Sequence, residues 1–113
     1  MRNLAIVSEI TGNEGSNIIG RVNEGETYVL VLDHVGDHRF QVSLVDELTN
    51  KRILVINRLV GVTTGRYVYE FRAPADAIVH YDMAGAGKDQ TRIRGKCYVR
   101  TLTPKSEYDA TQL

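Results

Sequence analysis

The sequence is short of residues on which several functional classes depend. It has no tryptophan, one cysteine and two prolines among 113 residues. A single cysteine cannot close an internal disulfide, so the disulfide framework of a small secreted domain is excluded. No apolar run approaches the roughly 18 residues of a membrane-spanning helix, and the apolar stretch before Glu9 is too short for a signal-peptide core. We therefore expect a protein made in a cytoplasm without a membrane anchor.

The chain also lacks an excess of either charge, with 14 basic and 14 acidic side chains. Without a net field the whole molecule is not drawn to nucleic acid or to anionic membranes, so any such binding must come from a local cluster. The sequence contains no Asn-X-Ser/Thr acceptor for glycosylation either. Its length suits one domain with one core.

Alternation of apolar and polar side chains is the main structural signal, and it is clearest at residues 65–72. There Tyr67, Tyr69 and Phe71 share one face, while charged side chains share the other. Three aromatic rings on one face bury a large apolar area, so we expect a half-buried central strand. Pro74 ends it, because proline has no N–H to donate to a neighbouring strand.

The same pattern predicts seven further strands separated by turn residues. They cover 4–8, 18–22, 26–33, 38–46, 52–57, 77–82 and 91–102. Residues 33–37 are expected to form a hairpin turn, and residues 59–65 an irregular connection. About eight short antiparallel strands without an amphipathic helix indicate an all-β fold, a single-domain β-sandwich of the jelly-roll type. The sandwich is expected at 1–102 and a polar tail at 103–113.

Four possible metal ligands lie close together around the expected turn. They are Asp33, His34, Asp37 and His38. Imidazole with carboxylate suits zinc or manganese. However, a tight hairpin with Gly36 at its tip is rich in Asp and His for conformational reasons, and only His80 and Cys97 are left to complete a zinc site. We therefore expect no metal, and we keep these four residues as the candidates for one.

Two other features invite a catalytic interpretation and do not support it. Residues 84–89, Ala-Gly-Ala-Gly-Lys-Asp, resemble a phosphate-binding loop, but Asp82 stands in place of the first glycine and Asp89 in place of the Ser or Thr. Cys97 lies in mid-strand among apolar neighbours, which is typical of a small buried side chain rather than a nucleophile. The carboxylates are scattered over turns. We expect no catalytic residues, no enzyme activity and no cofactor.

The last expected strand carries cations on one face with a tyrosine among them. These residues are Arg92, Arg94, Lys96, Tyr98 and Arg100. Such a stripe could hold an acidic protein surface or phosphates, or its cations could pair across strands with residues such as Glu70. The balanced overall charge favours a protein partner over nucleic acid. We predict these five as partner-binding residues.

Three segments, Gly25 to Asp33, Phe40 to Asp46 and Gly65 to Pro74, follow one another as a Gly-X-X-Tyr strand, a central strand and an aromatic strand. In this order they resemble the galactose-binding-like jelly rolls of carbohydrate-binding modules. The resemblance implies a β-sandwich and, as one alternative function, sugar binding. A sugar site would need exposed aromatic rings, and this chain has no tryptophan to supply one.

A small jelly roll without catalytic residues, a secretion signal or disulfides is also similar to bacteriophage virion accessory proteins, namely capsid decoration proteins, head fibres and tail adaptors. This resemblance implies a structural module of the virion, assembled in the host cytoplasm, that binds neighbouring capsid or tail subunits and forms a homo-oligomer. A carbohydrate-binding module is the first alternative. A metal-binding or enzymatic domain that uses the loop 33–38 is the second.

Overall fold

A computed structural model of the chain describes residues 8–11, 15–62, 64–84 and 94–108. The described chain is all-β, and its only helix is a 3₁₀ turn of three residues. The elements are β1 (Ser8–Thr11), β2 (Gly15–Val22), β3 (Thr27–Asp46), β4 (Arg52–Val62), β5 (Gly65–Arg72), β6 (Ala77–Ala84), β7 (Arg94–Pro104) and η1 (Lys105–Glu107). None of the described residues forms a helix long and apolar enough to cross a membrane. The prediction of an all-β chain is confirmed, with seven strands in the described ranges rather than about eight.

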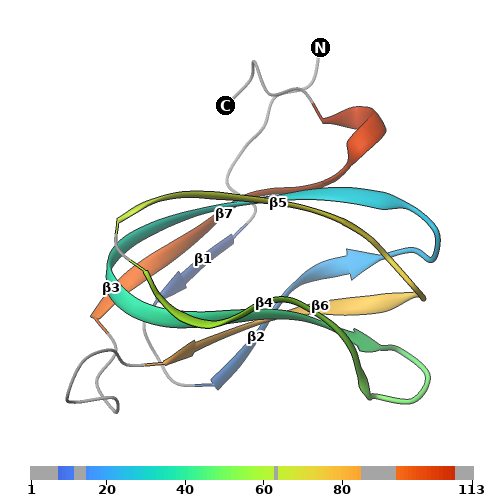
Figure 1. Cartoon of the computed structure of the whole chain (residues 1–113), viewed down its shortest axis with the longest axis horizontal. Coiled ribbons are helices and arrows are strands. Elements are labelled where there is room, and N and C mark those ends of the chain that lie inside the picture. Colours follow the sequence, from blue (N-terminus) through green and yellow to red (C-terminus); the bar gives the residue numbers. More distant parts are fainter. Residues whose placement is uncertain (1–7, 12–14, 63, 85–93, 109–113) are drawn as a thin grey trace.

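The long strand β3 belongs to two antiparallel sheets and organises the molecule. Its first half lies between β7 and β5, and β1 lies on the far side of β7. Its second half lies between β6 and β4, and β2 lies beyond β6. We call the first group sheet A and the second sheet B. Figure 1 shows them as an upper and a lower layer joined by the bend of β3.

Two facing glycines allow β3 to bend between the sheets. Gly36 of β3 has φ 97°, and it pairs with Gly95 of β7, which has φ 136°. A Cβ atom on Gly95 would lie 2.2 Å from the carbonyl oxygen of Val35, so the backbones approach too closely for any side chain there. The predicted hairpin at 33–37 is therefore wrong. The pairing with β7 continues from Asp33 to Asp37, which keeps this segment in the strand.

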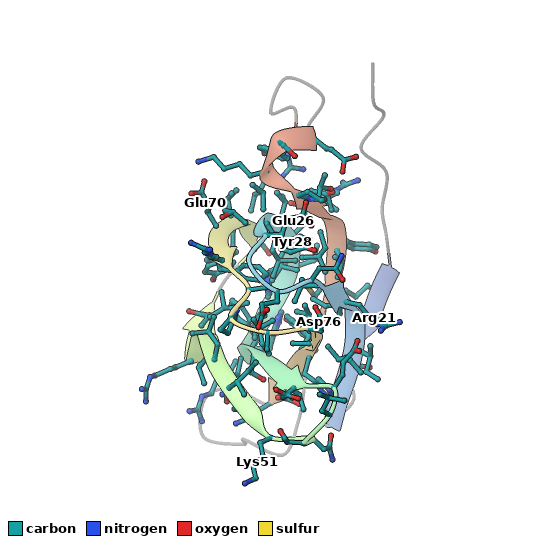
Figure 2. All side chains as sticks on the ribbon, turned by 90° about the vertical axis from the view of Figure 1, so that its right-hand side faces the viewer. Arg21, Glu26, Tyr28, Lys51, Glu70 and Asp76 are labelled. Atoms are coloured by element: carbon teal, nitrogen blue, oxygen red, sulfur yellow. The ribbon has the colours of Figure 1, made fainter. Side chains whose placement is uncertain are left out.

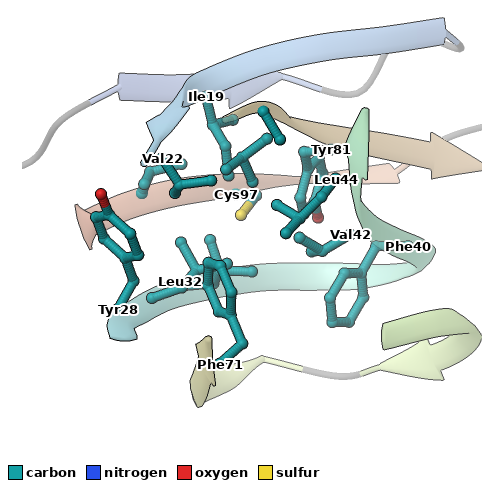
Figure 3. Close-up of a cluster of buried hydrophobic side chains, with 14 of the residues drawn as sticks. Ile19, Val22, Tyr28, Leu32, Phe40, Val42, Leu44, Phe71, Tyr81 and Cys97 are labelled. Atoms are coloured by element: carbon teal, nitrogen blue, oxygen red, sulfur yellow. The ribbon is translucent and has the colours of Figure 1, made fainter. Parts of the chain in front are cut away.

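The core fills the space between the two sheets with the inward side chains of β3 and its neighbours. Tyr28, Leu30 and Leu32 enter from sheet A. Phe40, Val42 and Leu44 enter from sheet B. Figure 3 shows this cluster, with side chains from both layers meeting in the middle. Its largest fully buried members from the other strands are Val22, Val79, Tyr81 and Val99. Burial of these side chains is the main force that holds the sheets together.

The aromatic strand β5 has the predicted faces but not the predicted position. Phe71 is buried, and Tyr67 and Tyr69 pack against the core. Arg66 and Glu70 point to solvent, as expected. However, β5 pairs with β3 alone among the described strands, so it lies at an edge of sheet A and is not central. A period of two reports which side of a strand is buried, and it carries no information on how many neighbours the strand has.

Several strand ends also differ from prediction. Strand β4 continues to Val62, through most of the connection expected at 59–65, because bulges after Phe40, Val42 and Leu44 of β3 absorb the irregular sequence. Strand β2 begins at Gly15, within an expected loop, and β7 ends at Pro104. The expected strand 4–8 and the loop 84–89 fall almost wholly outside the described residues.

Candidate functional site

The candidate metal ligands whose side chains are described lie on opposite faces of β3. His34 and His38 point inward and are 1% and 0% exposed, whereas Asp33 faces outward toward two arginines. Asp37 is part of β3, and its side chain lies outside the described ones. Among the described residues, no group of three or more His, Cys, Asp or Glu side chains could hold a metal ion. The strand thus separates Asp33 from the two histidines.

The inward pair, His34 and His38, spans the bend of β3. Nδ1 of His34 lies 2.7 Å from Nε2 of His38, and the two rings stack with centroids 4.8 Å apart and planes inclined by 19°. One nitrogen of this contact must donate and the other must accept, so the bond holds a single proton. The two side chains therefore lie in the core, on the inner side of the bend of β3 at Gly36, which we call the corner.

Other core side chains surround the histidine pair. Nε2 of His34 lies 3.7 Å from Sγ of Cys97, and the hydroxyl of Tyr81 lies 3.4 Å from Nε2 of His38. The ring of Phe40 packs on His34 at a centroid distance of 4.4 Å. His34 offers its two nitrogens to neighbours on opposite sides of the ring, so His38 and Cys97 cannot join it on the same ion.

Burial favours the neutral forms of His34, Cys97 and Tyr81. It lowers the pKa of His34 to about 4, with the neighbouring His38 as the second cause, and it raises the pKa of Cys97 to about 12. The pKa of Tyr81 is also raised, chiefly by burial. A protonated thiol is a poor nucleophile, and Cys97 is 0% exposed, as the sequence predicts for a core residue. The cluster is therefore suited to packing rather than to chemistry.

On the outer side of β3, Asp33 binds two arginines from the flanking strands. Arg66 of β5 donates from Nε and Nη2 to the two carboxylate oxygens at 2.6 and 2.9 Å, and Arg100 of β7 donates from Nε at 2.5 Å. Hydrogen bonding to Arg66 is the largest cause that lowers the pKa of Asp33 to about 2. The carboxylate is therefore ionised over the whole neutral range.

Strand β7 presents part of the predicted partner-binding stripe on this outer side. Lys96 is exposed, Tyr98 is half-buried, and Arg100 is engaged with Asp33. The backbone of Arg94 begins β7, but its side chain lies outside the described ones, as does the whole of Arg92. Because β7 lies between β1 and β3, the stripe lies on the face of sheet A and not along an edge.

A bulge at Arg100 changes which side chains of β7 face outward. Val99 pairs with Leu32 on the inner side, whereas Thr101 pairs with Val31 and Thr103 with Val29. Paired residues point to the same side of a sheet, so both threonines lie on the outer side of sheet A. Plain alternation in the sequence placed Arg100 correctly but gave no sign of this reversal.

An open hollow of about 350 Å³ lies at the other end of β3, away from the histidine pair. It is lined by Glu24, Asp46, Glu47, Leu48, Ala75 and Asp76. Asp76 accepts a hydrogen bond from the backbone N–H of Glu24, and Asp46 accepts from the N–H groups of Leu48 and Thr49. Figure 2 looks onto this end of the molecule, where Asp76 and Arg21 are labelled. These two carboxylates stabilise backbone turns by accepting hydrogen bonds from their N–H groups.

No family model, curated protein or solved structure matches this chain. The resemblances to galactose-binding-like jelly rolls and to virion accessory proteins therefore stay predictions. The function is inferred from the geometry of the structure. For sugar binding the geometry gives little support. All eight aromatic residues lie in described ranges, and each is buried or half-buried. The group of exposed tyrosines that a sugar platform requires is not found among them.

The fold leaves in solvent several apolar side chains that lie outside the predicted sites. Ile18 is 64% exposed, Val68 55%, Val35 47% and Leu48 96%. A signal for the first was present, because two successive isoleucines in a strand must point to opposite sides. Ile19 is buried in the core, so Ile18 has to face outward.

Proposed function

We propose that the protein is a non-catalytic interaction module that binds other protein subunits of a larger assembly, in the manner of bacteriophage virion accessory proteins. One observation carries this proposal. Two of the three histidines and the single cysteine, His34, His38 and Cys97, are at most 1% exposed, while apolar side chains on both sheets face solvent. Sealed groups cannot meet a substrate, whereas exposed apolar side chains gain free energy when a partner covers them. A jelly-roll topology for the sandwich belongs to the same proposal.

The outer face of sheet A suits an acidic partner. Arg66 and Arg100 keep 39% and 36% of their side chains exposed while they share Asp33, and Lys96 lies nearby on β7. A guanidinium group has five N–H donors, and Asp33 takes two from Arg66 and one from Arg100. The remaining donors can bind a second carboxylate from outside, so this face supplies charge-assisted contacts that set the register of a partner.

Binding of an acidic polypeptide tests this role. We expect poly-L-glutamate, used as a stand-in for an acidic protein surface, to shift the amide NMR signals of Lys96, Tyr98 and Arg100 in the full chain. The double variant Arg94→Glu and Lys96→Glu should lose these shifts while its circular dichroism stays unchanged. Lys51→Glu, which reverses an exposed charge in the turn between β3 and β4, is the matched control and should bind normally.

The outcome that contradicts this role is equally clear. If poly-L-glutamate shifts no signals on sheet A, or if the double variant binds it as well as the parent chain, the face has no part in partner binding. The alternative of a carbohydrate-binding module is decided by a glycan array. A glycan that binds and shifts the signal of Tyr98 would replace the proposed function with sugar recognition.

A further inference from the structure

On the outer side of sheet A, two apolar side chains that face away from the core are nevertheless buried. Val29 and Val31 point outward, beside Thr103 and Thr101, yet they are only 4% and 0% exposed. The segment η1 packs against β3 and lies on the outer side of this layer in Figure 1. The chain thus covers its own outward valines at this end of sheet A.

The outer side of sheet B carries a comparable apolar group. The pairing register forms two adjacent rows across β2, β6, β3 and β4. One row is Ile18, His80, Ser43 and Val55, and the other is Arg21, Ile78, Val45 and Arg52. The sequence neighbours Ile19, Val79 and Leu44 are core residues, so these two rows face outward.

The apolar members of these rows keep part of their surface in solvent, although Ser43 between them is buried. Ile18 is 64% exposed, and Val45, Val55 and Ile78 are half-buried. They form the centre of a four-stranded face, and none of them belongs to the core cluster. This side therefore has an open apolar centre, whereas Val29 and Val31 on the outer side of sheet A are covered.

Both arginines of these rows are paired within the chain. Arg21 donates from Nε and Nη2 to both carboxylate oxygens of Glu47, at 2.6 and 2.8 Å, and Arg52 lies 3.7 Å from Asp82. An apolar centre with a rim of compensated charges has the composition of a protein–protein interface.

From this face, and resting on the proposed function, we infer that two copies of the chain form a dimer by packing the outer sides of their B sheets against each other. In such a symmetric contact each face meets its own copy, so the face must not repel itself. An apolar centre whose flanking arginines are already paired meets this condition better than the face of sheet A that carries Arg66, Lys96 and Arg100. The two sheets would stack about 10 Å apart, as sheets do within a β-sandwich.

The size of the face sets the expected strength of the dimer. Four strands of about eight residues give a footprint on the order of 500 Å² for each copy. A standard interface covers about 800 Å² for each partner, so we expect a dimer that dissociates on dilution. Pairing through the edge strands is less suited, because a bulge between Ile18 and Gly20 interrupts β2, and Arg58 is exposed on β4.

Sedimentation of the full chain over a range of concentrations tests the dimer. We expect a monomer–dimer equilibrium whose dissociation constant rises at least about tenfold in Ile18→Lys and again in Ile78→Lys. Val68→Lys is the matched control, because Val68 is 55% exposed on the outer side of sheet A and should leave the equilibrium unchanged. Circular dichroism confirms that each variant is folded.

The possible failures separate the two proposals. A chain that stays monomeric at every concentration overturns the dimer, and if it still binds poly-L-glutamate through Lys96 the proposed function stands. A dimer that Val68→Lys disrupts and Ile18→Lys does not disrupt overturns the choice of face. A monomer that binds neither its own copy nor poly-L-glutamate overturns both.

Discussion

Asp33 and His34 are neighbours in the sequence, and the fold gives them opposite environments. The carboxylate of Asp33 lies on the outer side of β3 between two partly exposed arginines, and its pKa is lowered to about 2. The imidazole of His34 is 1% exposed in the core, where its pKa is lowered to about 4. The first group is held charged and the second neutral. Adjacent residues in a strand point to opposite faces, so a cluster in the sequence need not be a cluster in space.

The two regions also stabilise the fold by different amounts. An isolated ion pair that water can reach contributes up to about 1 kcal/mol, and a bidentate pair within a network such as that of Asp33 somewhat more. A buried hydrogen bond such as that between His34 and His38 matters more, because the loss of one partner leaves a polar atom without a bond in the core. We therefore expect the inner side of the corner to be far more sensitive to change than the outer side.

The largest effect is expected at the glycine that lets the corner form. Gly95→Ala places a Cβ atom against the backbone oxygen of Val35 at a φ of 136°, and neither strand can move away without breaking the ladder. We expect a loss of about 4 kcal/mol or more in the free energy of unfolding, measured in urea.

Gly25→Ala is the control for this change. Gly25 also has a positive φ, 82°, but the nearest atom to an added Cβ is the flexible end of Arg72 at 3.9 Å. It should lose only about 1 to 2 kcal/mol, the cost of the backbone conformation alone. Equal losses in the two variants would mean that close approach at the corner is unimportant.

The second effect is a dependence on pH that belongs to the buried histidine pair. The pKa of His34 falls from 6.5 to about 4 on folding, so between these values the unfolded chain binds more protons than the folded one. Stability should therefore decrease as the pH falls from 6.5 to about 4, by about 3 kcal/mol in total. Urea denaturation at a series of pH values measures this loss.

The double variant His34→Phe and His38→Leu tests whether the histidine pair causes this pH dependence. It should flatten the stability profile between pH 6.5 and 4 because no buried imidazole is left at the corner to protonate. Tyr67 and Phe40, whose rings pack on His34 from β5 and β3, should leave room for the phenylalanine ring. A variant profile as steep as that of the parent chain would place the pH dependence elsewhere.

The smallest effect is expected on the outer side. Asp33→Asn should reduce the free energy of unfolding by about 1 to 2 kcal/mol near neutral pH, because the pairs with Arg66 and Arg100 are partly solvated. The stability that Asp33 adds is present above pH 3.8 and is lost as the pH falls toward 2, so the variant should lack this acidic step. A loss as large as that of the histidine pair would contradict the contrast between the two sides.

Much of the fold could be predicted from alternation alone. It identified the all-β class, the buried faces of β3 and β5, and the burial of Cys97. These properties depend on which side of a strand a residue occupies, and a period of two reports that directly. The edge position of β5 and the continuity of β3 through Gly36 were missed, because they depend on partners far away in the chain.

The candidate sites were harder to predict for the same reason. The four clustered ligands suggested one metal site, but the register of β3 against β5 and β7 sends Asp33 to Arg66 and Arg100, and the bend brings His34 to His38. The bulge at Arg100 that turns Thr101 outward has no signature in the local sequence. An outward isoleucine at position 18 could have been inferred, but not the row of neighbours beside it.

By itself the sequence determined that this chain makes strands with one apolar side, because the spacing of its side chains acts within each short segment. Only the tertiary structure decided that one strand joins both sheets, that two histidines share a proton inside the corner, and that an apolar face of sheet B remains open. Those features require contacts between segments many residues apart. Their energies depend on distance and burial, which a linear pattern does not contain.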